Sequence, residues 1–216
     1  MKRGIIFDMD GTLWDSAENV AKSWDTVVQR EANGPRRITT LDIQQVMGHT
    51  MTEIAAMLFP MLSEKEAAGL MDQCCKEEND YLRTHGGVLY PNLENTLQIL
   101  SEQYPLYIVS NCQKGYIEAF LDYYKFGKYF LDTECFGNNQ MDKAYNIDLI
   151  VRRNYLEHAV YVGDIQGDYD SSMRAGVEFI HASYGFGSIN RSVPYIREFS
   201  ELPQAVSKIF ADGNFS

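Results

Sequence analysis

The first thirteen residues constrain the fold more than any other stretch of the chain. An apolar run, Gly4-Ile5-Ile6-Phe7, leads directly into Asp8-Met9-Asp10-Gly11-Thr12. The run is too short for a helix but suits a buried strand, and the glycine after it lets the backbone turn sharply. Side chains on extended backbone repeat every second residue, so Asp8 and Asp10 can point to the same side of the strand's carboxyl end. We therefore expect the chemistry of this chain to begin where its first strand ends.

Two neighbouring carboxylates repel each other unless a positive group lies beside them. A hard cation such as Mg²⁺, which prefers oxygen ligands, relieves that repulsion and leaves one carboxylate free to act as a nucleophile. A calcium loop is disfavoured, because it needs glycine at its sixth position and glutamate at its twelfth, where this chain has Leu13 and Asn19. A plain surface turn after a strand also uses Asp and Gly, and this stretch alone leaves that interpretation open.

Length and charge limit the classes of function. A chain of 216 residues is long enough for one large domain with a smaller insertion. Its formal net charge of −11 disfavours a nucleic-acid partner, since no basic run is longer than two residues, as in Arg36-Arg37. A small anionic substrate would need local cations or a bound metal to offset this charge.

Apolar runs and cysteines bear on where the protein works. No signal peptide and no run of membrane-spanning length is apparent, so we expect no membrane partner. The four cysteines show neither metal-ligand spacing nor a secreted framework, which fits a reducing cytoplasm. We expect a cytoplasmic protein that is a monomer or a weak homodimer.

Residues 16–84 are predicted to form an all-helical insertion. The segment Ala17 to Glu31 has apolar residues at helical spacing, and Asn33-Gly34-Pro35 ends it. Ser63-Glu64-Lys65-Glu66 forms a capping box that opens a long helix. Gly86-Gly87 closes the insertion and, with a short segment near Asp15, is a candidate hinge. We therefore divide the chain into an α/β catalytic core, 1–15 and 85–216, and a helical cap, 16–84.

From Val88 onward helices alternate with short apolar strands. Strands are expected at 106–109, 133–136, 159–162 and 178–181. The alternation predicts an α/β fold, a Rossmann-like doubly wound parallel sheet with helices on both faces. The carboxyl ends of parallel strands meet at one edge, where ligands bind. Asp8, Ser110 and Asp164 should therefore converge although they are far apart in the sequence.

The residues expected at this edge are four carboxylates, one hydroxyl, one amide and one lysine. They offer no Ser/His/Asp arrangement, because Ser110 lacks the context of a nucleophile elbow. Zinc is disfavoured, since His and Cys are missing from these turns. Oxygen ligation indicates Mg²⁺. A hydroxyl, an amide and a cation suit the equatorial oxygens of a transferring phosphoryl group.

These motifs, in this order, resemble those of the haloacid dehalogenase superfamily, specifically its phosphatases with a helical cap inserted after the first strand. The resemblance covers nearly the whole chain and rests on Asp8-Met9-Asp10-Gly11-Thr12, Ser110-Asn111, Lys143, and Gly163-Asp164 with Asp168. Two positions depart from the familiar pattern: Pro91-Asn92 stands where many relatives have Pro-Gly, and Ala144 rather than proline follows Lys143. Both departures concern the conformation of the backbone around the site rather than the reacting groups.

The resemblance implies roles for the reacting and phosphate-binding residues. Asp8 would attack phosphorus to form an aspartyl-phosphate, and Asp10 would protonate the leaving group and then activate water. Ser110, the backbone beside Asn111, and Lys143 would hold the phosphoryl oxygens. Lys143 and the metal would also keep Asp8 ionised, whereas Asp10 must hold a proton part of the time.

The same resemblance implies a metal site. Mg²⁺ would bind Asp8, the Asp10 carbonyl and Asp164. Asp168 would act either as a ligand through water or as a support for Lys143.

The turn Gly48-His49-Thr50 lies where the helical cap of relatives contributes a substrate loop. We expect His49 and Thr50 to donate hydrogen bonds to a substrate carboxylate or hydroxyl, although His49 as a solvated turn residue is equally plausible. The leading hypothesis is a Mg²⁺-dependent phosphatase of small phosphorylated metabolites, similar to phosphoglycolate phosphatases. A phosphomutase comes second, since the turn lacks the arginine expected of β-phosphoglucomutases. A non-catalytic binding or regulatory protein on the same fold is the third.

Overall fold

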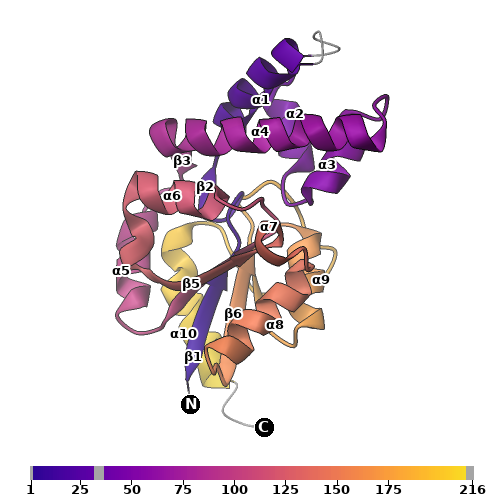
Figure 1. Cartoon of the computed structure of the whole chain (residues 1–216). Coiled ribbons are helices and arrows are strands. Elements are labelled where there is room, and N and C mark those ends of the chain that lie inside the picture. Colours follow the sequence, from indigo (N-terminus) through magenta and orange to yellow (C-terminus); the bar gives the residue numbers. More distant parts are fainter. Residues whose placement is uncertain (1, 32–36, 213–216) are drawn as a thin grey trace.

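A six-stranded parallel sheet forms the centre of the larger part of the molecule (Figure 1). The computed structural model describes residues 2–31 and 37–212, so the predicted break at Asn33-Gly34-Pro35 lies outside the described residues. The strand order is β5-β4-β1-β6-β7-β8. The strands are β1 (Arg3–Phe7), β4 (Leu106–Ser110), β5 (Phe130–Cys135), β6 (His158–Gly163), β7 (Glu178–Ala182) and β8 (Tyr195–Ile196). The predicted Rossmann-like α/β fold is confirmed.

The first strand lies in the middle of this sheet. Ile6 of β1 pairs with Tyr107 of β4 on one side and with Tyr161 of β6 on the other. A central parallel strand is covered on both faces, which explains why its sequence is an unbroken apolar run. β5 begins at Phe130, earlier than the predicted 133–136, and β8 is too short to give a sequence pattern.

Helices cover both faces of the sheet. The helices α5 (Leu93–Ser101), α6 (Tyr116–Tyr124) and α10 (Leu202–Asp212) pack with Phe7 on one face. The helices α8 (Lys143–Arg153) and α9 (Gln166–Arg174) pack with Ile6 on the other face, where they lie side by side. Short helical turns complete the core: η1 (Phe126–Lys128), α7 (Phe136–Asn139) and η2 (Phe199–Glu201).

Four helices lie above the carboxyl edge of the sheet (Figure 1). They are α1 (Ala17–Glu31), α2 (Thr40–Val46), α3 (Met51–Leu58) and α4 (Glu64–His85). The predicted capping box of α4 is formed: the Ser63 amide donates to the Glu66 carboxylate at 3.0 Å, and the Glu66 amide donates to the Ser63 hydroxyl at 3.4 Å. None of the described residues between 17 and 85 belongs to a strand.

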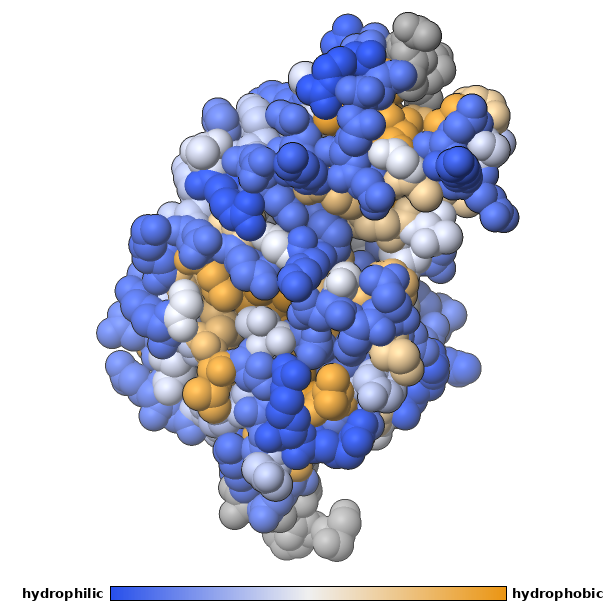
Figure 2. All heavy atoms as spheres, viewed as in Figure 1, coloured by the Kyte–Doolittle hydropathy of each residue, from blue (hydrophilic) through white to orange (hydrophobic). Residues whose placement is uncertain are grey.

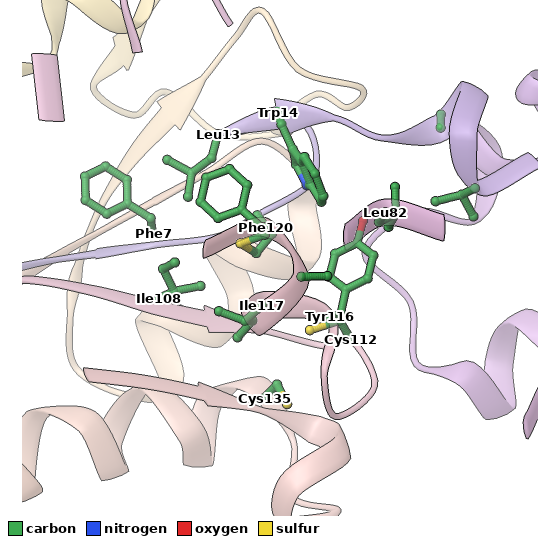
Figure 3. Close-up of a cluster of buried hydrophobic side chains, with 14 of the residues drawn as sticks. Phe7, Leu13, Trp14, Leu82, Ile108, Cys112, Tyr116, Ile117, Phe120 and Cys135 are labelled. Carbon is green, nitrogen blue, oxygen red and sulfur yellow. The ribbon is translucent and has the colours of Figure 1, made fainter. Parts of the chain in front are cut away.

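Two short strands connect these helices to the sheet. β2 (Trp14–Asp15) and β3 (Val88–Leu89) pair antiparallel. Trp14 packs edge-on against Tyr116 and Phe120, with ring centroids 5.6 and 5.0 Å apart (Figure 3). Gly86 has a φ of +65°, which favours glycine, and its carbonyl accepts a hydrogen bond from Asn19 at 2.9 Å. The junction is therefore fixed on the core side by a buried aromatic cluster.

The outer surface is mostly polar. Hydrophilic residues cover most of the face in Figure 2, and hydrophobic ones are visible between the upper helices. Among the residues that the structure describes, no helix has the length and apolarity needed to span a membrane.

Candidate active site

Three buried carboxylates come together at the carboxyl edge of the sheet. Asp8 follows β1, Asp164 follows β6, and Asp168 lies in the first turn of α9. One oxygen from each lies within 4.8 Å of the others. The parallel sheet brings them together because β1 and β6 are neighbours and end at the same edge.

Lys143 joins this carboxylate cluster from the start of α8. Its side chain is 3 % exposed, and its Nζ lies 2.8 Å from Asp8 Oδ1 and 2.6 Å from Asp168 Oδ1. The second Asp168 oxygen accepts backbone N–H bonds from Asp164 at 3.0 Å and Ile165 at 3.2 Å. Asp168 thus orients both the lysine and the turn after β6. Its contacts match the predicted support role, and metal ligation by Asp168 stays a prediction.

The cluster carries more negative than positive charge. Burial, followed by repulsion from Asp168, raises the pKa of Asp8 to about 7, although Lys143 acts in the opposite direction. Burial and the neighbouring carboxylates also raise the pKa of Asp164 well above its usual range. One ammonium does not balance three carboxylates. The all-oxygen donor set and this excess charge fit a hard divalent cation such as Mg²⁺.

Asp10 is held apart from this cluster. Its Oδ1 accepts hydrogen bonds from the Ser16 hydroxyl at 2.7 Å and the Tyr116 hydroxyl at 2.6 Å. Burial raises the pKa of Asp10 to about 6, and these two hydrogen bonds partly offset the rise. A carboxyl with such a pKa exchanges a proton readily near neutral pH, which is the property required of an acid and base catalyst.

Two of the predicted phosphate-binding residues, Ser110 and Asn111, line one cavity with Asp8 and Asp10, whereas Lys143 is not among the residues that line it. Ser110 ends β4 and is buried, and Asn111 follows it. The Asn111 side-chain amide donates to the Gly48 carbonyl in the turn between α2 and α3 at 2.8 Å. This hydrogen bond joins the core to the helical part directly above the cavity.

The two predicted cap residues have different surroundings. His49 lines the cavity with a side chain that is 44 % exposed, and its Nδ1 lies 3.7 Å from Glu53. Thr50 instead caps α3, where its hydroxyl donates to Glu53 at 2.8 Å. The structure does not place Thr50 among the residues that line the cavity.

Several site residues were not predicted from the sequence. Ser16 lies at a loop end, and Tyr116 lies among the buried residues of α6, where apolar spacing accounts for it. Glu78 of α4 also lines the cavity, and its carboxyl accepts a hydrogen bond from the Trp24 indole. A sequence signal for Glu78 existed: it lies four residues from both Cys74 and Leu82, as the one carboxylate in a buried stripe.

Comparisons with known proteins agree with this geometry. The family described as haloacid dehalogenase-like hydrolase matches residues 5–182. A phosphoglycolate phosphatase from Rhodobacter capsulatus is 26% identical and one from Aquifex aeolicus 25% identical. The alignments cover 95% of this chain and 97% of the first relative, and 89% of this chain and 90% of the second.

Solved structures show the same fold. A haloacid dehalogenase-like family hydrolase from Streptococcus pneumoniae superposes with a TM-score of 0.81 at 21% identity, covering 95% of this chain and 98% of that one. A predicted phosphoglycolate phosphatase from Haemophilus somnus gives the same TM-score at 18% identity and the same coverage. The chain belongs to the haloacid dehalogenase-like hydrolases and is an enzyme of the superfamily that includes these phosphatases.

Proposed function

We propose that this hydrolase is a Mg²⁺-dependent phosphatase of a small phosphate monoester, of the phosphoglycolate or sugar-phosphate type. The observation that carries the proposal is the pair Asp8 and Asp10 on one cavity in two different environments. Asp8 contacts Lys143 at 2.8 Å within the carboxylate cluster, whereas Asp10 is bonded only to hydroxyls. Two carboxyl groups tuned separately suit one nucleophile and one acid and base.

The metal would be held by Asp8, Asp164 and the Asp10 carbonyl, with Asp168 orienting Lys143. Bound there, Mg²⁺ would shield the carboxylates and withdraw charge from the phosphoryl oxygens. The donor set supports this assignment, since the nearby groups are carboxylates rather than His or Cys.

The chain's own residues would act in two steps. In the first, an Asp8 oxygen attacks phosphorus, the bond from phosphorus to the leaving oxygen breaks, and Asp10 gives that oxygen its proton. In the second, Asp10 takes a proton from water, which attacks the aspartyl-phosphate and restores Asp8. Lys143 and Ser110 would hold the phosphoryl oxygens throughout.

The surroundings of the site support the rest of the proposal. Residues 16–84 would act as a cap that closes over the substrate, with the short segments near Asp15 and at Gly86-Gly87 as its hinges. The negative net charge supports small metabolites rather than nucleic acid as partners. We place the enzyme in the cytoplasm.

Phosphate release tests the function. The purified protein with Mg²⁺ should release inorganic phosphate from a panel of sugar phosphates, phosphoglycolate, nucleotides and pyrophosphate. We expect one class of small monoester to be preferred. Transfer of phosphate between two positions of a sugar without release would support a phosphomutase instead, and a protein that turns over nothing on the panel would contradict the proposal.

A further inference from the structure

The cavity beside Asp10 is where the leaving group of a phosphate ester would lie. It encloses about 30 Å³, which is small for a ligand site and favours a leaving alcohol of few carbons. All four upper helices contribute to its wall. The apolar part of the wall from these helices includes Val20, Trp24, Ile43, Val46 and Ile54.

The polar groups of this wall include the hydroxyls of Ser110 and Tyr116 and several hydrogen-bond acceptors. Glu78 is 3 % exposed, and one of its oxygens accepts from the Trp24 indole. None of the residues found to line the cavity is Lys or Arg. His49 is the one histidine among the residues found to line the cavity, and it lies beside Glu53.

Gln113 presents its oxygen, not its nitrogen, as the unpaired atom. The Asn79 side-chain amide donates to the Lys114 carbonyl at 2.9 Å, so the Asn79 oxygen must accept. It accepts from Gln113 Nε2 at 3.0 Å, which fixes the orientation of the Gln113 amide. Gln113 Oε1 is then buried with no hydrogen-bond partner, in a side chain only 9 % exposed.

The same reasoning applies to Asn111. Its Nδ2 donates to the carbonyl of Gly48, a group that can only accept. The amide orientation is thereby fixed, and Asn111 Oδ1 is left buried with no partner. Two unpaired amide oxygens and the Glu78 carboxyl therefore lie around one cavity.

Buried acceptors without partners call for a donor. A hydroxyl or an ammonium group can satisfy the two unpaired amide oxygens, whereas a carboxylate brings only further acceptors. We propose that the leaving alcohol carries a hydrogen-bond donor that Glu78, Gln113 and Asn111 recognise, and that the enzyme discriminates against leaving groups that carry a carboxylate. This inference rests on the proposed phosphatase function and narrows its substrate class.

Four small phosphate esters test the inference on the unaltered protein. Ethyl phosphate has no extra group, glycerol phosphate adds hydroxyls, phosphoethanolamine adds an ammonium, and phosphoglycolate adds a carboxylate. We expect kcat/KM for glycerol phosphate or phosphoethanolamine to exceed that for ethyl phosphate at least about tenfold, and phosphoglycolate to rank lowest. Phosphoglycolate as the best of the four would overturn the inference.

Glu78→Gln keeps the size of the side chain and replaces its carboxyl group by an amide. The ratio of kcat/KM for the preferred donor-bearing ester to that for ethyl phosphate should fall at least about fivefold. A loss confined to phosphoethanolamine identifies an ammonium as the recognised group, and a loss that includes glycerol phosphate identifies a hydroxyl. Glu77→Gln is the matched control, because Glu77 is the next residue of α4, 42 % exposed and outside the cavity. Equal ratios in the two variants would contradict a role for Glu78.

Measurements of ester binding distinguish a failure of this inference from a failure of the phosphatase proposal. Calorimetric titration of the four esters into Asp8→Asn with Mg²⁺ ranks their affinities without turnover. The wild-type protein could hydrolyse none of the four esters while the variant binds the donor-bearing esters most tightly. That result would overturn the phosphatase proposal and support the cavity assignment. Equal affinities and equal turnover of all four would support the phosphatase and overturn the cavity assignment.

Discussion

Two buried acidic regions of this protein differ in what compensates them. At the sheet edge, Asp8 and Asp168 contact Lys143, and Asp168 also accepts two backbone N–H bonds. In the upper helices, Glu78 is compensated by hydrogen bonds from the Trp24 indole and the Gln113 side chain and by no cation among the described residues. The first region has the donors and charges for a metal and a phosphoryl group. The second offers acceptors to whatever organic group is attached to that phosphate. The hydrogen-bond donors and cations around the carboxylates, rather than burial, therefore distinguish the two regions.

Removal of the metal from the sheet-edge region should reduce turnover more than any of the substitutions below. We expect turnover to be lost in excess chelator and restored by Mg²⁺, because the carboxylate cluster repels an anionic substrate when it is uncompensated. Ca²⁺ should restore it poorly, since its larger and looser shell disturbs an in-line geometry. Phosphate release after dialysis against chelator is the measurement, and full activity in chelator would contradict the metal assignment.

Asp8→Asn should give the next largest loss of turnover. The amide keeps the shape of the carboxyl but is a poor nucleophile, so kcat should fall by at least about ten-thousandfold while ester binding is largely retained. Phosphate release and calorimetric binding measure the two properties separately. Asp148→Asn, an exposed change on α8, should behave like the native protein. Near-native hydrolysis by Asp8→Asn would show that another group attacks phosphorus.

Asp10→Asn should cost less than the loss of the nucleophile. A missing acid and base group slows both steps by about two to four orders of magnitude. Esters with a good leaving group, such as p-nitrophenyl phosphate, need less protonation and should therefore lose less in the first step. A rate loss of the same size for every leaving group, measured in single-turnover experiments, would argue against proton donation by Asp10.

The smallest effect concerns the stability of the helical part. Burial raises the pKa of Glu78 from its usual 4.5 to about 8, with Asp10 of the core facing it and Cys74 and Cys75 beside it on α4. The folded state therefore holds a proton on Glu78 that the unfolded state releases above pH 4.5. This contribution to stability is complete below about pH 4.5 and is lost as pH rises through about 8.

Glu78→Gln removes this titration. The melting temperature of the variant relative to the native protein should rise between pH 5 and pH 8.5 by on the order of 5 °C. Differential scanning calorimetry at the two pH values measures it, with Glu77→Gln as the control that should show no such trend. A constant difference between Glu78→Gln and the native protein at both pH values would contradict a buried protonated Glu78.

The sequence could predict the sheet because its central strands are covered on both faces. β1, β4 and β6 are short apolar runs, and the polar residues that follow each of them mark the same edge. Asp8, Lys143 and Asp164 could be placed together for this reason, since topology rather than local spacing brings them together. The β2 and β3 strands are two residues long and left no pattern.

Contacts between elements could not be predicted in this way. Ser16 and Tyr116 form hydrogen bonds to each other and to Asp10, and no spacing rule connects positions 100 residues apart. Tyr116 also fits an apolar helix face, so its hydroxyl gave no signal. Thr50 was expected to face the substrate, but the need of α3 for an N-cap accounts for its hydroxyl. Gln113 became informative only once the orientation of its amide was fixed by its neighbours.

The hydrogen bond from Asn111 to the Gly48 carbonyl would link ligand binding at the sheet edge to closure of the upper helices. Asn111 follows the predicted phosphoryl-binding Ser110, whereas Gly48 belongs to the turn above it, with a φ of +84° and a Cβ position only 2.4 Å from Ile165 Cδ1. A side chain at position 48 would strain this backbone conformation and require the Ile165 side chain to move. Any ligand that strengthens this contact therefore favours closure, and by reciprocity closure strengthens the binding of that ligand by the same factor. The Asn111 bond shares this coupling with the bonds that Asn79 of α4 makes to Gln113 and to the Lys114 carbonyl.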